Sequence, residues 1–508
     1  MAEDNRGRIA KNTGFLYLRM IVVMLVSLYT SRIILHTLGF EDFGIYNVVG
    51  SVVTFLSFFQ AALRNATFRY LTFEMGAGNI EKISKVFSMS INTHLILAII
   101  LFVLMEIGGV WLINNKLVIA EDRLIAANWA YQFSLLTFCI TIIRTPYDSC
   151  IIAYEKMDFY ALTSIVEVAL KLLIVYLLII VPFDKLIVYA ILLTLVTVLL
   201  SFWYVIYCKR KFPDCKYIKY WDKDMLRQFT SYSGWSLLVN GATITRTQCI
   251  SIFFNLFLGV LANAALGIAN QVVSSLNMFV TNFTQAFRPQ IIKSWAARDY
   301  DYFMKLIFSS SKMAYFLLLI ISIPIVVNID FVLKVWLGEY PPMAPVFIET
   351  IILYYLIDAF QEPLITSVHA TGNLKYHQIM IATIVFMVIP VSYILLRVGC
   401  PGSYVLIANA LANVVCAVGR TLYMRRLINL NVAEYLKKVV VPVLAVTLLS
   451  LPLPLYMSQR LNESWLNVIL ICGVSVILTG LSCYFVGLSN SEREILKSIP
   501  FVKKVLGK

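Results

Sequence analysis

Long apolar runs separated by short polar segments recur along the whole chain. A helix that crosses the hydrocarbon core of a bilayer, roughly 30 Å thick, needs about 20 apolar residues in succession. Fourteen runs of this kind are present, at residues 15–38, 43–63, 86–113, 125–149, 159–181, 185–207, 231–258, 263–287, 313–334, 345–369, 376–396, 402–424, 439–457 and 465–487. Open strands would leave backbone groups unpaired in lipid. The pattern therefore predicts an all-α polytopic membrane protein with about 14 transmembrane helices.

The composition excludes the water-soluble classes of protein. Of the 508 residues, 60% are hydrophobic and 14% are charged, and the mean hydropathy is +0.81. A soluble domain carries about 25% charged residues. The polar side chains are too few to cover a water-facing surface, which rules out a soluble enzyme, a nucleic-acid-binding protein and a disordered scaffold.

The distribution of basic residues predicts the orientation. The chain has 42 Lys and Arg against 28 Asp and Glu. If the N-terminus is cytoplasmic, the loops on that side hold most of the Lys and Arg, and the loops on the other side hold six. Those six are Lys116, Arg123, Lys185, Lys334, Arg397 and Arg460. By the positive-inside rule, both termini are predicted to be cytoplasmic.

Short sequence phrases recur in the two halves of the chain. Leu38-Gly39 and Gly44-Ile45 reappear as Leu258-Gly259 and Gly267-Ile268, and Pro146 and Ala153 reappear as Pro363 and Ala370. The order of these matches indicates an internal duplication, with two six-helix lobes related by a pseudo-two-fold axis along the membrane normal. The predicted parts are an N-terminal lobe (1–208), a cytoplasmic linker (209–229), a C-terminal lobe (230–425), and helices 13 and 14 with a basic tail (426–508).

Four cationic side chains lie within the predicted spans. They are Arg19, Arg32, Lys171 and Arg246. A charge facing lipid at mid-membrane costs at least about 2.5–3.5 kcal/mol, so these side chains are expected to face a cavity. The planar fork of Arg suits phosphate, which favours an anionic substrate. Arg64 and Arg288 match across the repeat and are predicted at the mouth of that cavity.

Each of these cations has a structural alternative. Arg246 can tie down helix carbonyl groups, and Arg19 and Arg32 can snorkel to the nearest interface. Lys171 follows Glu167 by four residues on the same helix face, so the two can neutralise each other. Arg64 and Arg288 can simply satisfy the positive-inside rule.

Acidic and amide side chains in the second half suggest a site for a coupling ion or a gate. Asp358 and Glu362 share a face at i,i+4 spacing, and Asn409 and Asn413 share another. Two close carboxylates can hold a shared proton or a Na⁺ ion. The alternatives are pairing with the arginines and hydrogen bonds between helices. No ATP-binding motif, nucleophile motif or metal-spaced His cluster is present, so neither an enzyme nor a cofactor is predicted.

Several phrases resemble the Wzx-type polysaccharide flippases of the MOP superfamily. They are Lys11-Asn12-Thr13, Thr30-Ser31-Arg32, Leu38-Gly39, Gly44-Ile45-Tyr46 and the turn Tyr154-Glu155-Lys156-Met157-Asp158 after Pro146. The resemblance covers the whole chain and implies a MATE-like, V-shaped fold. It implies that a lipid-linked oligosaccharide on polyprenyl pyrophosphate is moved across a bacterial inner membrane by alternating access, for O-antigen, lipopolysaccharide or capsule synthesis. The expected partners are that substrate, membrane lipids and polysaccharide polymerases, with a monomer as the working unit.

Three alternatives to this function stay open. A MATE-type multidrug cation antiporter would favour acids in its N-terminal lobe, whereas the first span here has Arg19 and Arg32 and no acid between them. The sequence does little to distinguish a lipid II flippase from a flippase for a lipid-linked oligosaccharide. A membrane-embedded polymerase or ligase would usually work in a large outer loop, and the predicted outer loops are short.

Overall fold

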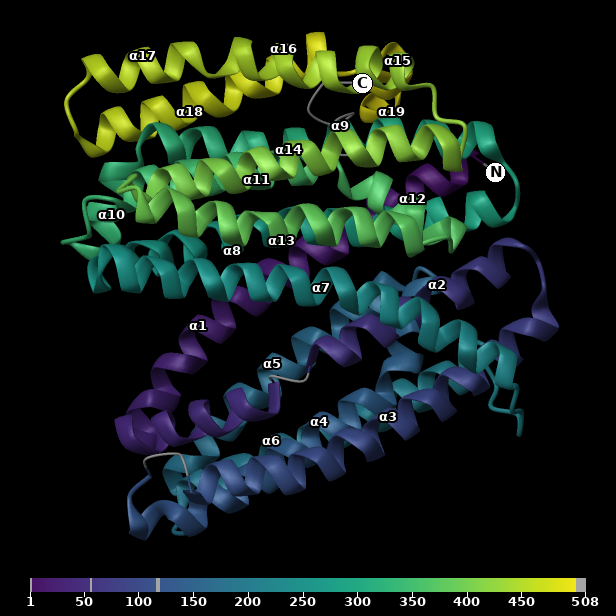
Figure 1. The fold of residues 1–508 in the computed structure, drawn as a ribbon. Helices are drawn as coiled ribbons and strands as arrows, with labels where there is room; N and C mark the ends of the chain where they lie inside the picture. The colour runs from purple at the N-terminus through teal and green to yellow at the C-terminus, as the bar shows by residue number, and fades with distance from the viewer. Residues whose placement is uncertain (1, 55–56, 116–118, 499–508) are drawn as a thin grey trace. The chain divides into compact units, whose positions relative to one another are not determined.

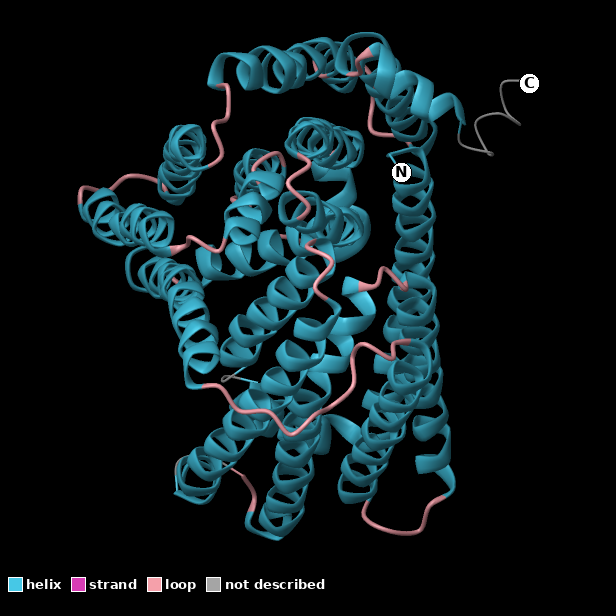
Figure 2. Cartoon of the chain, turned by 90° about the vertical axis from the view of Figure 1, so that its right-hand side faces the viewer, coloured by secondary structure: helices cyan, strands magenta, loops and turns pink. Residues whose placement is uncertain are grey.

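The computed structural model consists of helices joined by short loops (Figures 1 and 2). The structure describes residues 2–54, 57–115 and 119–498, and at some positions within these ranges the backbone alone. No strand occurs in these ranges. The predicted all-α architecture of a polytopic membrane protein is confirmed.

The chain divides into two compact units. The N-unit comprises residues 11–237, and the C-unit comprises residues 238–508 together with 1–10. Two helices belong to both units, α1 (Ala2–Thr54) and α7 (Lys223–Leu258). The predicted boundaries at 208, 229 and 425 stay predictions.

The N-unit is built around α4. Its helices are α1, α2 (Ser57–Gly76), α3 (Ile80–Asn115), α4 (Leu124–Ala153, after a 3₁₀ turn at Glu121–Arg123), α5 (Met157–Ile180), α6 (Lys185–Lys211) and the start of α7. Helix α4 packs against α2, α3, α5 and α6. Its side chains therefore reach the interior of this bundle from several directions.

The C-unit has a comparable centre formed by α8, α9, α11 and α14. Its helices after α7 are α8 (Val260–Ala296), α9 (Tyr300–Val327), α10 (Ile329–Leu337), α11 (Ala344–Ala359), α12 (Glu362–Thr371), α13 (Lys375–Arg397) and α14 (Gly402–Leu427). They are followed by α15 (Val432–Tyr435), a π-helical segment (Leu436–Val440), α16 (Val441–Ser450), α17 (Pro452–Arg460), α18 (Trp465–Ser482), a second π-helical segment (Cys483–Gly487) and α19 (Asn490–Ser498). Helix α11 packs against α8, α9 and α14, and α18 packs against α9.

Nine helices in the described ranges are long and apolar enough to cross a membrane. They are Ile80–Asn115, Glu121–Ala153, Met157–Ile180, Lys185–Lys211, Tyr300–Val327, Lys375–Arg397, Gly402–Leu427, Val432–Arg460 and Trp465–Gly487. A bent pair, α11 with α12, makes ten if it counts as one span. The other predicted spans fall on α1, α2, α7 and α8. For those four the count of fourteen stays a prediction.

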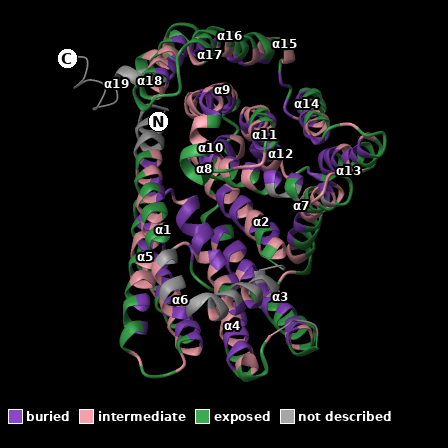
Figure 3. Ribbon diagram, turned by 90° about the vertical axis from the view of Figure 1, so that its left-hand side faces the viewer, coloured by how far each residue is buried: buried purple, intermediate pink, exposed green. Residues whose placement is uncertain are grey.

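Side-chain exposure agrees with a lipid surround. Large apolar side chains that are 72–80% exposed include Ile107, Ile180, Phe183, Leu448 and Leu466. Figure 3 shows such exposed positions on outward helix faces and buried positions on the faces between neighbouring helices. Because these residues would be costly in water, the exposed belt suits a bilayer.

Several helix boundaries differ from the prediction, and two of these differences have a clear local cause. Residues 39–42 were expected to separate two helices, but α1 runs without interruption from Ala2 to Thr54. One glycine weakens a helix by only about 1 kcal/mol, and this stretch has no proline to end it. Helix α9 begins at Tyr300 instead of 313, because Asp299 caps it by accepting a hydrogen bond from the Tyr302 amide (3.1 Å).

The span predicted at 345–369 is broken. Helices α11 and α12 meet at an angle of 41° across Phe360 and Gln361. Pro363 lacks an N–H and its ring clashes with the carbonyl four residues earlier. At the break, the carbonyl of Phe360 accepts a hydrogen bond from the Tyr435 hydroxyl at 3.3 Å. A hydropathy average cannot detect a break of this kind.

Gly109 on α3 is a position where a side chain cannot fit. The Tyr131 hydroxyl of α4 donates a hydrogen bond to the Met105 carbonyl at 2.6 Å, and the Tyr131 ring is fully buried. A Cβ on Gly109 would fall on that hydroxyl and lie 2.6 Å from the ring carbon that carries it, whereas a Cβ on Gly108 would meet nothing within 4 Å.

A buried ion pair fastens α19 to α9. Lys312 donates to Glu492 at 2.6 Å and to the Gly487 carbonyl at 3.2 Å, and both charged side chains are under 10% exposed. Glu492 also accepts hydrogen bonds from the Ser489 amide and hydroxyl at 2.8 Å, and the amide bond is the glutamate half of a capping box at the start of α19. Burial alone would raise the pKa of the Glu492 carboxyl, but these hydrogen bonds hold that pKa below its ordinary value.

We expect Gly109→Ala to lower the free energy of unfolding by about 1–3 kcal/mol, because Tyr131 must move in a packed core. Gly108→Ala should instead be neutral or stabilise by up to about 1 kcal/mol, because alanine is the better helix former. Denaturant unfolding of both variants in detergent measures the difference. Equal effects of the two substitutions would show that Gly109 makes no room for Tyr131.

We expect Glu492→Gln to destabilise the protein by about 3–5 kcal/mol, because Lys312 is left buried without a counter-charge. A carboxyl whose pKa is lowered by folding contributes stability above its unfolded pKa of about 4.3, and loses it as the pH falls through the folded pKa. The thermal unfolding temperature, measured from pH 7 to pH 3, should therefore fall more steeply in wild type than in Glu492→Gln. The exposed neighbour variant, Glu494→Gln, should behave like wild type.

Candidate functional site

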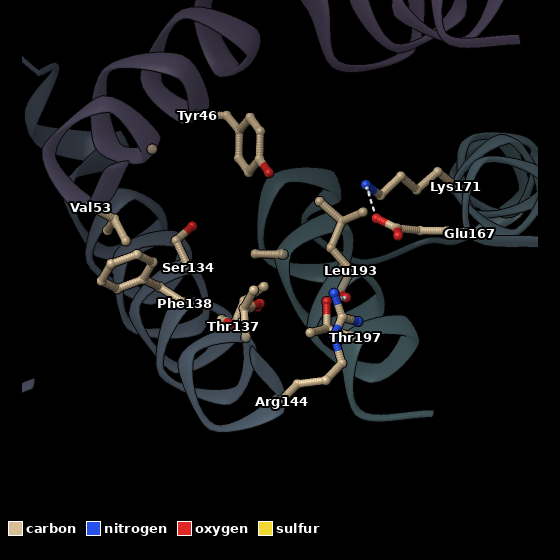
Figure 4. A pocket seen from close by; sticks show the side chains of 13 residues that line it. Tyr46, Val53, Ser134, Thr137, Phe138, Arg144, Glu167, Lys171, Leu193 and Thr197 are labelled. Atoms are coloured by element: carbon tan, nitrogen blue, oxygen red, sulfur yellow. Dashed lines mark hydrogen bonds and ion pairs between the residues drawn. The ribbon is translucent and has the colours of Figure 1, made fainter. Parts of the chain in front are cut away.

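The N-unit contains a cavity of about 330 Å³, which we call the N-unit pocket (Figure 4). Its lining comes from α1 (Tyr46, Gly50, Val53), α4 (Ser134, Thr137, Phe138, Thr141, Arg144), α5 (Glu167, Lys171) and α6 (Ala190, Leu193, Thr197). This volume is at the lower end of the range of about 300–1,000 Å³ found for small-molecule sites. The lining combines apolar side chains with hydroxyl and charged groups.

Lys171 and Glu167 enter the pocket together from α5. The Lys171 Nζ donates to the Glu167 Oε1 at 2.7 Å, and the two side chains are 42% and 35% exposed. The Glu–Lys order at i,i+4 spacing favours this pair on a helix. The pairing predicted from the sequence is present, and it lies on the wall of a cavity.

Arg144 supplies a second cation from α4, on a different side of the pocket from Lys171 (Figure 4). Its guanidinium carbon lies 4.9 Å from the centre of the Tyr204 ring, and its Nε lies 3.6 Å from the Asp148 Oδ2. That distance is too long for a hydrogen bond. Arg144, which stands near the end of the span predicted at 125–149, was not singled out from the sequence. Its i,i+4 spacing to Asp148 is the signal that points to a shared inner face.

The threonines of the pocket present oxygen lone pairs rather than hydrogens. Thr141 and Thr197 donate to the carbonyls four residues earlier, at 2.8 and 3.0 Å. Thr137 lies 2.9 Å from the Thr194 hydroxyl, and Thr194 donates to backbone carbonyls, so Thr137 is the donor of that pair. A hydroxyl that already donates its hydrogen bond within the protein can still accept hydrogen bonds from a sugar.

Arg19 and Arg64 meet at a tyrosine outside the pocket lining. The guanidinium carbon of Arg19 lies 4.6 Å from the centre of the Tyr160 ring. Arg64 on α2 hydrogen-bonds Tyr160 and interacts electrostatically with Asp148. Arg32 lies in α1, and its side chain is outside the described residues.

In the C-unit, Arg246 lies against Tyr354. Its Nη1 donates to the Tyr354 hydroxyl at 3.4 Å, and its guanidinium carbon lies 5.4 Å from the ring centre. The residue is 8% exposed, and its Nε has no hydrogen-bond acceptor among the described residues. Phenol rings stabilise a guanidinium without neutralising it.

The carboxylates of Asp358 and Glu362 lie on either side of the break between α11 and α12. Asp358 interacts electrostatically with Arg420 and Arg246. Glu362 interacts with Arg288 and Arg420. Guanidinium groups of the protein thus lie around both carboxylates, as in the alternative that pairs them with arginines.

Arg420 on α14 was missed as a site residue, because it stands at the end of a predicted span among other basic residues. It is 4% exposed, and it donates from Nε to the His377 Nε2 and from Nη1 to the Gln361 Oε1, both at 3.2 Å. Gln361 is the residue at the helix break. Asn413 and Arg420 are seven residues apart on one face of α14, which is the signal that could have found Arg420.

The two asparagines of α14 have different surroundings. Asn413 donates to the Tyr354 carbonyl at 3.0 Å and hydrogen-bonds Asp358. The amide oxygen of Asn409 is buried and has no hydrogen-bond partner within the described part of the chain. In the same ranges, no group of three or more His, Cys, Asp or Glu could hold a metal ion.

The predicted site residues therefore fall into two groups. Lys171, Arg19 and Arg64 belong to the N-unit, and Lys171 alone of these lines the pocket. The C-unit gathers its predicted residues around the helix break. These are Arg246, Arg288, Asp358, Glu362 and Asn413. Their roles in binding or coupling stay predictions.

Comparison with known proteins gives a family and a fold. A family model described as "Polysaccharide biosynthesis protein" matches residues 9–295. No curated protein matches the chain by sequence.

Solved transporter structures match most of the chain. A crystal structure of MATE in complex with MaL6 has a TM-score of 0.69 at 14% identity, and the match covers 86% of this chain and 99% of that one. A MOP superfamily transporter from Pyrococcus furiosus has a TM-score of 0.68 at 14% identity, over 85% and 98%. An outward-facing multidrug resistance MATE family transporter has a TM-score of 0.67 at 15% identity, over 84% and 98%. These matches confirm the predicted MATE-like fold.

We expect Arg420→Gln to lower the free energy of unfolding by about 3–5 kcal/mol, because it removes a buried cation from two carboxylates. Arg425→Gln, at an exposed position on the same helix, should change it by no more than about 0.5 kcal/mol. Denaturant unfolding of the purified variants measures both. If Arg420→Gln were as harmless as Arg425→Gln, the charges around the break would not depend on Arg420.

Proposed function

Since the chain belongs to the polysaccharide biosynthesis protein family, we propose that it is a flippase for a lipid-linked oligosaccharide. The substrate is carried on polyprenyl pyrophosphate and crosses a bacterial cytoplasmic membrane from the inner to the outer leaflet by alternating access. The product would serve the synthesis of lipopolysaccharide, O-antigen or capsule.

One observation carries this proposal. Arg246 is a buried guanidinium with an Nε–H that lacks an acceptor in the described structure and an Nη1 that has only a phenol at 3.4 Å. A buried donor without an acceptor is costly, and a guanidinium binds phosphate oxygens in pairs. An entering pyrophosphate would supply the missing acceptors.

The wider charge pattern supports an anionic cargo. The P. furiosus relative is described as having a binding pocket of reverse polarity, which suggests a different function for that protein. Pocket polarity thus differs among transporters of this fold. Here the in-span cations are mostly arginines, and the acid of the N-unit pocket is already paired with Lys171. A cationic drug would find little free negative charge there, so the multidrug antiporter is the weaker candidate.

The remaining parts of the proposal follow from the family and the sequence. No ATP-binding motif is present in the sequence, so transport would draw on an H⁺ or Na⁺ gradient or on the membrane potential. Asp358, Glu362, Asn409 and Asn413 stay the candidates for coupling or gating. The protein would work as a monomer beside a polysaccharide polymerase, with both termini in the cytoplasm.

We expect proteoliposomes with the wild-type protein to move a fluorescent polyprenyl-pyrophosphate oligosaccharide between leaflets. Arg246→Ala should slow transfer at least about tenfold, because a hydrogen bond to a charged group contributes about 1.5–3 kcal/mol. Arg246→Lys should restore part of the rate, because it keeps the charge and loses the fork. Arg227→Ala, at an exposed position on the same helix, is the matched control and should transport like wild type.

Three outcomes would contradict the proposal. Export of cationic dyes without lipid transfer would favour the antiporter. Transfer of lipid II in preference to other carriers would favour the peptidoglycan substrate. Formation of new glycosidic bonds by the purified protein would favour a polymerase or ligase.

A further inference from the structure

We propose that the N-unit pocket is an anion site for a phosphorylated sugar, and that Glu167 occupies it as a tethered competitor. The inference rests on the proposed function for the source of the anion, and on the geometry of the pocket for the site itself. Lys171 is the cation that Glu167 now holds and that an entering phosphate would take over.

The ion pair is of a kind that can be exchanged. Both partners are on α5, one turn apart, and about a third or more of each side chain is exposed. Pairs with this degree of exposure contribute little to stability, because solvent screens them and their side chains lose freedom in pairing. Glu167 can therefore leave Lys171 at small cost when a stronger anion arrives.

A second cation is available on another wall of the pocket. Arg144 is held by the Tyr204 ring, and its Nε has no hydrogen-bond partner in the part of the chain that the structure describes. Asp148 is its nearest carboxylate, at 3.6 Å, and Asp148 also interacts with Arg64. The lining itself thus holds two cations, Lys171 and Arg144, and one carboxylate, Glu167, so the excess of positive charge becomes larger where Glu167 turns away.

The uncharged lining selects for a sugar phosphate over a bare ion. The hydroxyl groups of Thr137, Thr141 and Thr197 already donate hydrogen bonds to other groups, so their oxygens can only accept further hydrogen bonds. They repel an anion weakly and attract sugar hydroxyls. Phe138 and Val53 add an apolar wall on which a pyranose ring can pack. A ligand with both anionic oxygens and hydroxyl donors uses all of these groups.

The chain contains its own matched control. Glu81 and Lys85 on α3 form a Glu–Lys pair with the same i,i+4 spacing and the same 2.7 Å separation. This pair lines no part of the N-unit pocket. Substitutions at Glu81 and Lys85 therefore reproduce the charge change without touching the proposed site.

The test is calorimetric titration of the full-length protein in nanodiscs with inorganic pyrophosphate and with glucose 1-phosphate. We expect Glu167→Gln to bind both probes about fivefold more tightly than wild type, because the internal competitor is gone. Lys171→Gln should lose measurable binding, and Lys171→Arg should keep it. Glu81→Gln and Lys85→Gln should bind like wild type. Thermal unfolding verifies that each variant is folded.

Glucose 1-phosphate should bind more tightly than pyrophosphate if the threonine oxygens accept from the sugar, and methyl glucoside should not bind. Equal affinity of wild type and Glu167→Gln, or retained binding in folded Lys171→Gln, would overturn the proposal. So would a Glu81→Gln variant that gains as much affinity as Glu167→Gln, because the effect would then be one of net charge.

The lipid source is distinguished by a separate arm. Nanodiscs that contain polyprenyl pyrophosphate should occupy the site and weaken the titration with glucose 1-phosphate, whereas nanodiscs with polyprenol should not. Tighter binding in Glu167→Gln without leaflet transfer of any lipid-linked oligosaccharide would leave the anion site standing and overturn the flippase. If no pyrophosphate binds, and leaflet transfer is unchanged in Glu167→Gln and Lys171→Gln, the flippase proposal would stand and the anion site would be overturned.

Discussion

A charge at membrane depth has no water around it, so it depends on a counter-charge or a polarisable group within its own helical unit. In the C-unit this requirement gathers Asp358 and Glu362 with arginines from α7, α8 and α14. In the N-unit it sets Arg19 from α1 and Arg64 from α2 against Tyr160 of α5. Helices that would otherwise need only an apolar seam therefore carry polar faces, and these faces fix which helices pack together.

Three arginines share one further means of stabilisation, because each lies over a tyrosine ring. The pairs are Arg19 with Tyr160, Arg144 with Tyr204, and Arg246 with Tyr354, at 4.6, 4.9 and 5.4 Å from guanidinium carbon to ring centre. Asp148 also lies near Arg144, and Asp358 interacts with Arg246, but each of these carboxylates is shared with a second arginine. A ring holds the guanidinium in place and leaves its positive charge, and often a donor, to act on something else. The interior therefore stays cationic, and the tyrosine rings lower the free-energy cost of holding these charges at membrane depth.

Local sequence rules were enough to predict the helices and the side-chain pairs within one helix. Twenty-residue apolar runs predicted most spans, and i,i+4 spacing predicted the contact between Glu167 and Lys171. What failed was anything set by a partner from another helix. Arg420 looked like an ordinary helix-end basic residue, because its acceptors Gln361 and His377 lie 59 and 43 positions away in the chain. Arg144 was underestimated for the same reason, since Tyr204 comes from α6.

The two matched prolines show why such information is tertiary. Pro146 sits inside α4, which continues through it, whereas Pro363 stands at a 41° break between α11 and α12. Both prolines remove the same backbone donor. The C-unit has partners ready for the groups that a break exposes, since Tyr435 binds the Phe360 carbonyl and Arg420 binds the Gln361 side chain. A proline thus permits a break, and the surrounding side chains decide whether the helix takes it. A proline is therefore present in both halves of the predicted duplication, but only the helix of the C-unit breaks at it. The N-unit retains one continuous helix as a wall of its pocket, and the C-unit gains a bend flanked by two carboxylates.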